Sequence, residues 1–212
     1  YFTLLFIEHY YGKETFTEGL ISSKKRVESF HEKNPDYIII HDNLKNMKDV
    51  TSSQTYQKGS WVLHMLRGVL GTEIFWKGIR SYYSKFKDLN ATTEDFRQVM
   101  EEVSGLNLNP FFQQWLYKPG TLELDGQWFY DKQNKELVLE INQIQKGGGL
   151  IQMPIEIGID SPNQTKIVKI QLKDKQGIYK IKIDQKPLKI ILDPNLWVLM
   201  NSNFELPYQS KK

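Results

Sequence analysis

The chain has 212 residues, of which 40% are hydrophobic, so it is long enough for one large domain or two small ones. The formal net charge is only +3 and the lysines are scattered, which argues against a nucleic-acid-binding protein. Cysteine is absent, so disulfides and thiolate metal sites are excluded. No apolar run approaches the roughly 20 residues that a membrane-spanning helix needs.

The chain opens with YFTLLFIEHYYG, residues 1–12, which has the spacing of a helix closed by Gly12. This helix begins in mid-pattern, without a methionine or a capping residue before it, which suggests a piece of a longer protein. One or two further helices are predicted for residues 13–33, broken by Pro35. Residues 36–54 are expected to form an extended link and a loop.

Residues 55–71, TYQKGSWVLHMLRGVLG, have the spacing of a buried helix. Their apolar residues recur at three- and four-residue steps: Val62, Met65, Leu66 and Val69. The entrance to this helix is unusual, because a helix that only fills a core does not need a tyrosine there. Tyr56 therefore serves either to pack or to donate a proton, and the residues alone leave both open.

The next predicted helix begins at Thr72, which is expected to be its N-cap. Its apolar face is expected to carry Phe75, Ile79 and either Tyr82 or Tyr83. Two more helices should follow before a Pro-Gly pair ends the helical region, and these two have their own capping signals.

Thr92 and Asp95 have the spacing of a capping box, and Gly105 is the expected stop of that helix. Asn109 is expected to cap the last helix, because Pro110 suits the first helical position. From residue 121 the apolar period changes to two, as in ELVLEI, IEIGID, IVKIQL and IYKIKID, with turn-forming residues between these segments. This pattern predicts an antiparallel β-sandwich.

The four histidines do not complete a metal site in the sequence. His31 begins HEKNP, which resembles the zinc motif H-E-x-x-H, but Pro35 stands where the second histidine should be. His9 lacks the partner of the inverted motif, and His41 has no evident partner. His64 is expected to be a hydrogen-bonded interior histidine.

Several segments together resemble the zinc aminopeptidases of the M1 family. They are TYQKGSWVLHMLRGVLGTEIFWKGIRSYYSKF and, after it, NATTEDFRQVMEEVSGLNLNPFFQQWLYKPG. In that family a Y-x-K-G sequence opens a helix, and a T-x-x-D-F helix and an FFxQW helix ending in Pro-Gly follow in this order. The match in order is much more specific than any one segment.

The resemblance implies an α+β protein with two domains. Residues 1–120 would be the helical lobe, the C-terminal half of a thermolysin-like catalytic domain, and residues 121–212 an antiparallel Ig-like β-sandwich. It also implies a hydrolase that removes N-terminal residues from peptide substrates with a zinc ion. The zinc ligands and the catalytic glutamate would lie upstream of Tyr1, in the other half of the catalytic domain. No metal ligand is therefore assigned here, and the isolated chain is expected to be inactive and without stoichiometric zinc.

One functional residue carries over from the family. The tyrosine of Y-x-K-G falls on Tyr56, whose hydroxyl would donate to the oxyanion of the tetrahedral intermediate, since a phenol stays protonated at neutral pH. Lys58 is expected to orient the loop rather than to touch substrate, and Gly59 to let the helix entrance pack closely.

Two other classes of function stay open. A non-catalytic M1-like scaffold would keep the fold without the zinc motif, and the sequence upstream of Tyr1 would tell the two apart. A carbohydrate-binding sandwich would need exposed aromatic residues on one face, for which Trp128, Tyr130 and Trp197 are the candidates. The sequence leaves the compartment open, with an exported bacterial protein preferred over a cytoplasmic one.

Overall fold

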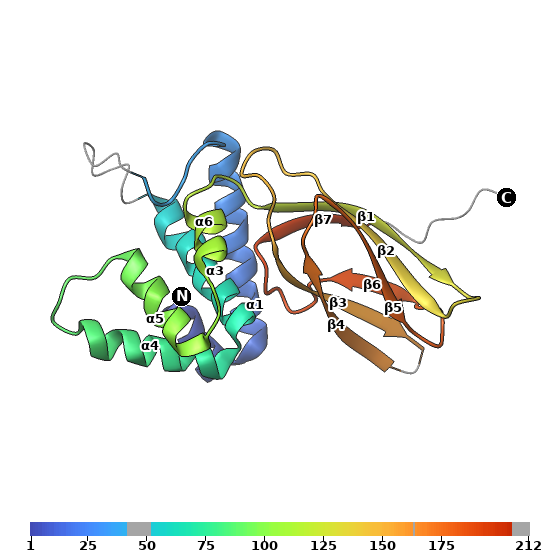
Figure 1. The fold of residues 1–212 in the computed structure, drawn as a ribbon, viewed down its shortest axis with the longest axis horizontal. Coiled ribbons are helices and arrows are strands. Elements are labelled where there is room, and N and C mark those ends of the chain that lie inside the picture. Colours follow the sequence, from blue (N-terminus) through green and yellow to red (C-terminus); the bar gives the residue numbers. More distant parts are fainter. Residues whose placement is uncertain (42–51, 163, 205–212) are drawn as a thin grey trace. The chain divides into compact units, whose positions relative to one another are not determined.

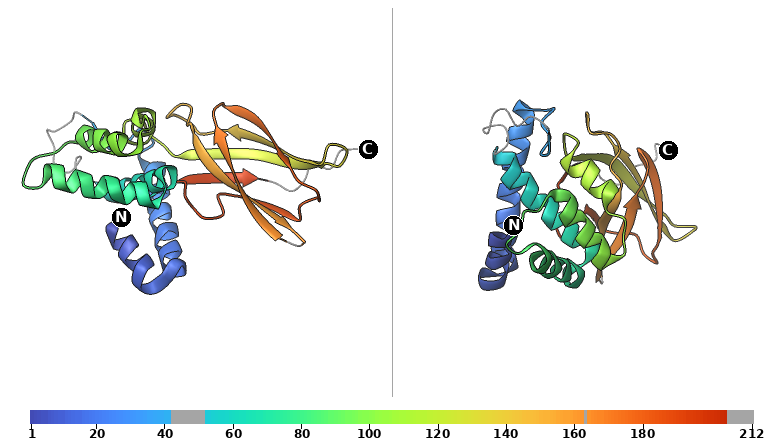
Figure 2. Two further views of the ribbon diagram at one scale, coloured as in Figure 1. Left: turned by 60° about the horizontal axis from the view of Figure 1, so that its bottom comes forward. Right: turned by 60° about the vertical axis from the view of Figure 1, so that its left-hand side comes forward.

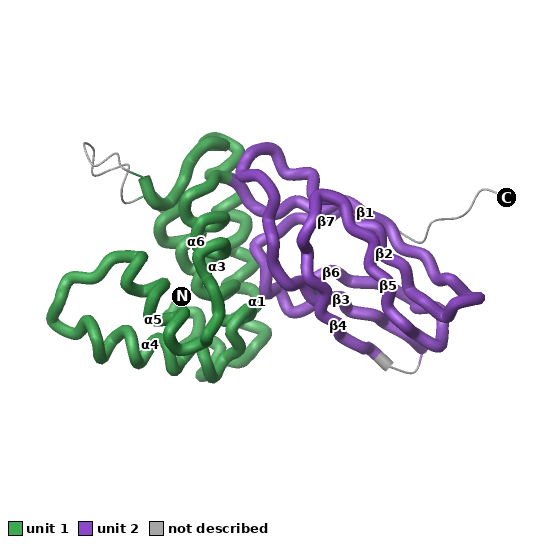
Figure 3. The backbone as a smooth tube through the Cα atoms, viewed as in Figure 1, with its two compact units in different colours: residues 1–119 green, residues 120–212 purple. Residues whose placement is uncertain are grey.

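The computed structural model of the chain describes residues 1–41, 52–162 and 164–204. The chain divides into two compact units, Tyr1–Pro119 and Gly120–Lys212 (Figure 3). All described helices belong to the first unit and all described strands to the second (Figure 1), so the chain is an α+β protein with its two kinds of element segregated.

The first helix, α1 (Phe2–Lys33), is longer than the sequence predicts but is broken at the expected glycine. Gly12 has φ 87° and ψ 173°, values that are not helical and that glycine adopts without strain. Figure 2 shows the resulting bend between the two halves of α1. Gly12 therefore separates two helical segments, and the second ends at Asn34, just before Pro35.

The next two helices, α3 (Ser53–Leu70) and α4 (Thr72–Phe86), are joined by one residue, Gly71, with φ 81°. The prediction that Thr72 is an N-cap is wrong, because Gly71 takes that position. The Thr72 hydroxyl instead accepts a hydrogen bond of 3.1 Å from Nε of Arg67, near the end of α3. Most of the loop predicted for residues 36–54 lies outside the described residues.

The two remaining helices are α5 (Thr93–Ser104) and α6 (Asn109–Leu116). The capping box is confirmed, with the Thr92 hydroxyl accepting from the Asp95 amide and the Asp95 carboxylate accepting from the Thr92 amide, and the helix ends at Gly105 in the left-handed conformation. The prediction that Asn109 caps α6 is wrong. The cap comes from α5, where Glu101 accepts from the amides of residues 108 and 109 at 2.6 and 3.1 Å.

The core of the helical unit is built from the apolar stripes of these helices. It includes two fully buried tryptophans, Trp61 on α3 and Trp115 on α6, together with Leu66 and Phe75. Each such side chain contributes about 2–3 kcal/mol of hydrophobic stabilisation relative to an exposed one. The predicted apolar face of α3 is thereby confirmed, apart from a half-buried Val69.

The second unit contains two sheets. The first has the strand order β5-β2-β1-β7 and the second the order β4-β3-β6. The strands are β1 (Leu122–Asp131), β2 (Glu136–Gln143), β3 (Met153–Ser161), β4 (Gln164–Leu172), β5 (Gln176–Lys182), β6 (Lys189–Leu192) and β7 (Met200–Phe204). The residues predicted to share one face of β2 and of β3 are buried: Leu137, Leu139 and Ile141, and Ile155, Ile157 and Ile159. Strict alternation does not hold in these two strands, because Val138, Glu156 and Gly158 between them are buried as well. It does hold in β5, where exposed residues alternate with less exposed ones.

One strand pair departs from the predicted antiparallel arrangement. β7 pairs with β1 in parallel, from Leu122 opposite Met200 to Gly126 opposite Phe204. The other described pairs are antiparallel. Alternation along a single strand indicates which residues are buried but carries no information on the direction of a partner about 80 residues away.

Candidate active-site residues on the first turns of α3

Tyr56 is the fourth residue of α3, in the turn where the helix begins. Its side chain is 71% exposed, which makes it one of the most exposed large aromatic residues described. A ring that served the core of this unit would be buried, so packing within the described residues does not account for Tyr56. Its hydroxyl is accessible to a partner that lies outside this unit.

The residues on either side of Tyr56 are fixed to α1. The Nε2 of Gln54, which is 4% exposed, donates to the carbonyl oxygen of Val27 at 3.0 Å. One residue after Tyr56, the Oε1 of Gln57 accepts from the hydroxyl of Ser23 at 2.9 Å. The exposed tyrosine therefore projects from a backbone that is anchored on both sides.

Lys58 supplies a third anchor, toward the end of α6. Its Nζ lies 3.5 Å from the carbonyl oxygen of Lys118, and the side chain is only 4% exposed. Burial lowers the pKa of Lys58 to about 8, because the charged ammonium loses its hydration. The expected role of Gly59 is not supported, since a Cβ there would meet nothing within 4 Å among the described residues. We call Gln54, Gln57 and Lys58 the α3 collar.

Further along α3, a polar network joins the helix to the start of α1. His64 is 1% exposed, and its Nδ1 lies 3.0 Å from the Tyr1 hydroxyl, in agreement with the expected hydrogen-bonded interior histidine. Arg67 donates to the same hydroxyl at 3.4 Å and to Glu8 at 2.8 Å. Burial raises the pKa of the Tyr1 hydroxyl to about 12, against the opposing effect of Arg67.

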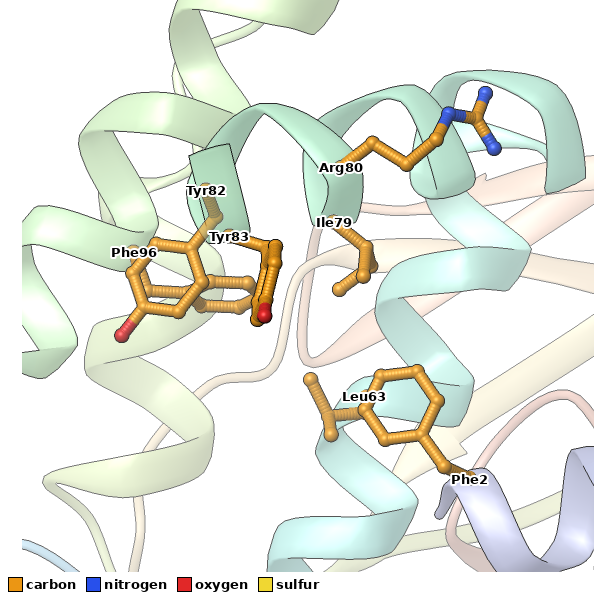
Figure 4. A pocket seen from close by; sticks show the side chains of 7 residues that line it. All are labelled: Phe2, Leu63, Ile79, Arg80, Tyr82, Tyr83 and Phe96. Atoms are coloured by element: carbon orange, nitrogen blue, oxygen red, sulfur yellow. The ribbon is translucent and has the colours of Figure 1, made fainter. Parts of the chain in front are cut away.

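An apolar groove of about 710 Å³ lies between α1, α3, α4 and α5. Figure 4 shows the residues that line it: Phe2, Leu63, Ile79, Arg80, Tyr82, Tyr83 and Phe96. The guanidinium of Arg80 points away from the rings of Tyr82 and Phe96, so the lining offers little hydrogen-bonding capacity. Of the two tyrosines predicted for the buried face of α4, Tyr82 is half-buried and Tyr83 is 66% exposed.

The described residues do not supply a zinc site. They contain no group of three or more histidine, aspartate or glutamate side chains that could hold a metal ion.

None of the helices in the described ranges has the length and apolar character that crossing a membrane requires. The carbohydrate-binding alternative needs exposed aromatic residues, but Trp128 is 3% exposed and both Tyr130 and Trp197 are half-buried.

Sequence reasoning names Tyr56 as a candidate through the resemblance but gives no indication of the contacts made by the two glutamines of the α3 collar. Gln54 and Gln57 stand at the polar start of a helix, where such residues usually face solvent. Their partners are a backbone carbonyl and a serine about 30 residues earlier. No local pattern signals a contact at that separation.

Comparison with known proteins gives a consistent result. The Peptidase family M1 domain matches residues 1–115. Aminopeptidase M1-D of Oryza sativa subsp. japonica is 30% identical over 190 residues, which cover 85% of this chain and 20% of that protein. The puromycin-sensitive aminopeptidase of Caenorhabditis elegans is 29% identical over 76% of this chain and 17% of its own length. The chain thus spans about a fifth of the length of these relatives.

A solved structure shares the fold. Aminopeptidase A of Legionella pneumophila, determined in complex with aspartic acid, superposes with a TM-score of 0.69 at 16% sequence identity, over 88% of this chain and 23% of that one. Since the M1 domain covers more than half of the chain and the relatives at about 30% identity are aminopeptidases, the chain belongs to peptidase family M1.

Proposed function

We propose that this chain is the C-terminal part of the catalytic region of a longer M1 aminopeptidase, which hydrolyses N-terminal residues from peptides. Residues 1–120 would be the helical lobe of a thermolysin-like domain, and residues 121–212 an Ig-like β-sandwich with a scaffolding role. The family membership of the chain supports the peptidase activity. The two separate sheets of the second unit support the sandwich.

The residues described here do not fit a zinc ion, so the metal of the family would be held by protein outside this chain. The isolated chain should accordingly be inactive. Its own contribution to the reaction would be the hydroxyl of Tyr56. When water attacks the scissile carbonyl, that oxygen becomes an oxyanion, and a correctly placed phenol stabilises it by donating a hydrogen bond.

The observation that carries this proposal is the combination of exposure and anchoring at Tyr56. Its ring is 71% exposed, whereas Gln54 and Lys58, two residues to either side, are each only 4% exposed. A side chain that is presented outward from a fixed backbone matches what a transition-state donor needs, because such a donor must be in place before charge develops.

The test uses Tyr56→Phe in the longer polypeptide that contains this chain, with an aminoacyl-4-nitroanilide as substrate. Loss of one oxyanion donor should lower kcat by about 10²–10³, while KM changes much less because the bond is made chiefly in the transition state. Zinc content should stay the same. The matched control is Tyr83→Phe, since Tyr83 is a similarly exposed tyrosine of the same unit, at 66%.

Near-normal kcat in a folded, zinc-loaded Tyr56→Phe enzyme would refute the catalytic assignment. The alternative of a non-catalytic scaffold is tested separately. If the polypeptide upstream of Tyr1 lacks an H-E-x-x-H motif and a following glutamate ligand, the aminopeptidase proposal fails for the whole protein.

A further inference from the structure

Lys58 occupies an environment that is unfavourable for a lysine. It is 4% exposed, and its ammonium lies 3.5 Å from the carbonyl oxygen of Lys118. Lysine is almost never fully buried, because removing its charge from water is costly. A methionine of similar length would fill the same space without that cost, so hydrophobic packing does not explain a lysine at this position.

The position of Lys58 in the chain suggests what its ammonium contributes. The first amide groups of a helix have no partner within the helix, so the first turns fray more easily than the middle. Tyr56 lies in these turns, two residues before Lys58. If the turns fray, the direction of the Tyr56 side chain changes, and the hydroxyl at the end of the ring moves furthest.

The contact of Lys58 complements those of the other two collar residues. Gln54 and Gln57 both bond to α1, through Val27 and Ser23. Lys58 reaches a different segment, the residues that follow α6. Anchors to two separate segments restrict rotation of the α3 start about its axis, which contacts to α1 alone would allow.

We propose that Lys58 is a positioning residue, whose contact with the Lys118 carbonyl holds the first turns of α3 in place and so aims the Tyr56 hydroxyl. This inference rests on the role proposed above for Tyr56. Lys58 is not expected to touch the substrate, and its effect on the reaction should pass through the tyrosine.

The test is a double-mutant cycle in the longer polypeptide, which combines Lys58→Met with Tyr56→Phe. A displacement of about 1 Å in a catalytic group can cost up to about 10²-fold in rate, so Lys58→Met alone should lower kcat by about 10-fold or more. KM and zinc content should stay close to the parent values. In the Tyr56→Phe background the same substitution should change kcat by less than about 2-fold, because no hydroxyl remains to be aimed.

The matched control is Lys77→Met, which makes the same substitution at an exposed lysine of α4 and should leave kcat unchanged. Folding of each variant is checked by circular dichroism. Lys58→Gln provides a second variant, since its side chain is too short to reach the Lys118 carbonyl, and it should show the same loss of kcat as Lys58→Met.

The outcomes separate the two proposals. If Tyr56→Phe lowers kcat as expected but Lys58→Met lowers it equally in both backgrounds, Lys58 acts independently of the tyrosine and the positioning role is refuted. Unchanged kcat in both folded Lys58 variants refutes it as well. If Tyr56→Phe itself has no effect, the catalytic role of Tyr56 fails first, and the positioning role fails with it.

Discussion

Two helical glycines allow one substitution to be tested in opposite environments. Gly78 lies on α4 and is buried, and a Cβ there would overlap the Sδ of Met100 and lie 3.1 Å from its Cε. Gly59 lies on α3, and a Cβ there would meet nothing within 4 Å among the described residues. Alanine is favoured over glycine inside a helix by about 1 kcal/mol, so the sign at each site depends on the space available.

At Gly59 no steric overlap offsets the higher helix propensity of alanine, so Gly59→Ala should stabilise the chain by about 0.5–1 kcal/mol. At Gly78 the added methyl overpacks the α4–α5 contact, which costs about 1–3 kcal/mol. Met100 is fully buried, so the end of its side chain would have to repack within the core to admit the methyl group. Gly78→Ala should therefore destabilise the chain by up to about 2 kcal/mol, and the two variants should differ by about 2 kcal/mol.

The assay is urea unfolding of the 212-residue chain, monitored by the far-ultraviolet circular dichroism signal of α-helix. This signal reports on the first unit, because all described helices lie there. With a denaturant slope of roughly 2 kcal/mol per M, the two midpoints should lie about 1 M apart. Gly78→Ala as stable as Gly59→Ala would mean that Met100 moves aside freely, and would refute the close-packing argument.

Three further predictions concern other parts of the first unit. Thr92→Ala removes the confirmed capping box with Asp95 and should lower the free energy of unfolding by about 1 kcal/mol in the same urea assay. An unchanged free energy of unfolding would mean that water replaces the cap without cost. Lys58→Met removes a buried charge and should raise the free energy of global unfolding by about 1–3 kcal/mol at pH 7 in the urea assay, although it releases the first turns of α3 locally. The folded-state pKa of Lys58 lies below its unfolded value, so the unfolded chain binds the proton more strongly, and this gain should shrink as the pH rises from 8 towards 10.5. Dialysis of the isolated chain against zinc, followed by metal analysis, should find no stoichiometric zinc; one tightly held ion per chain would contradict the assignment of all ligands to protein outside it.

The predictions that rest on local chemistry agree best with the structure. Thr92 and Asp95 form the predicted capping box, because both partners lie within one turn of sequence. Asn109 is not the cap of α6, because Glu101 reaches the free amides from the end of another helix. A cap supplied across a helix–helix contact depends on tertiary packing, which the residue spacing around Asn109 does not record.

In the candidate site, too, local sequence signals were predictable and long-range contacts were not. The Y-x-K-G sequence identifies Tyr56, but sequence alone does not reveal that its ring is 71% exposed. The anchors of the α3 collar join positions about 30 to 60 residues apart. Contacts of this kind are set by how the helices pack, and a single sequence without aligned relatives gives no signal for them.

The parallel pairing of β1 with β7 has a mechanical consequence for the second unit. β1 is its first strand and β7 the last strand described, and they are neighbours along five residue pairs. A force that pulls the two ends of this unit apart would slide these strands past each other. Their ladder of hydrogen bonds would then carry the load together, instead of opening one bond at a time as in a hairpin pulled from its open end. The unit should therefore transmit tension between the segments on either side of it with little extension, and yield abruptly once this strand pair separates.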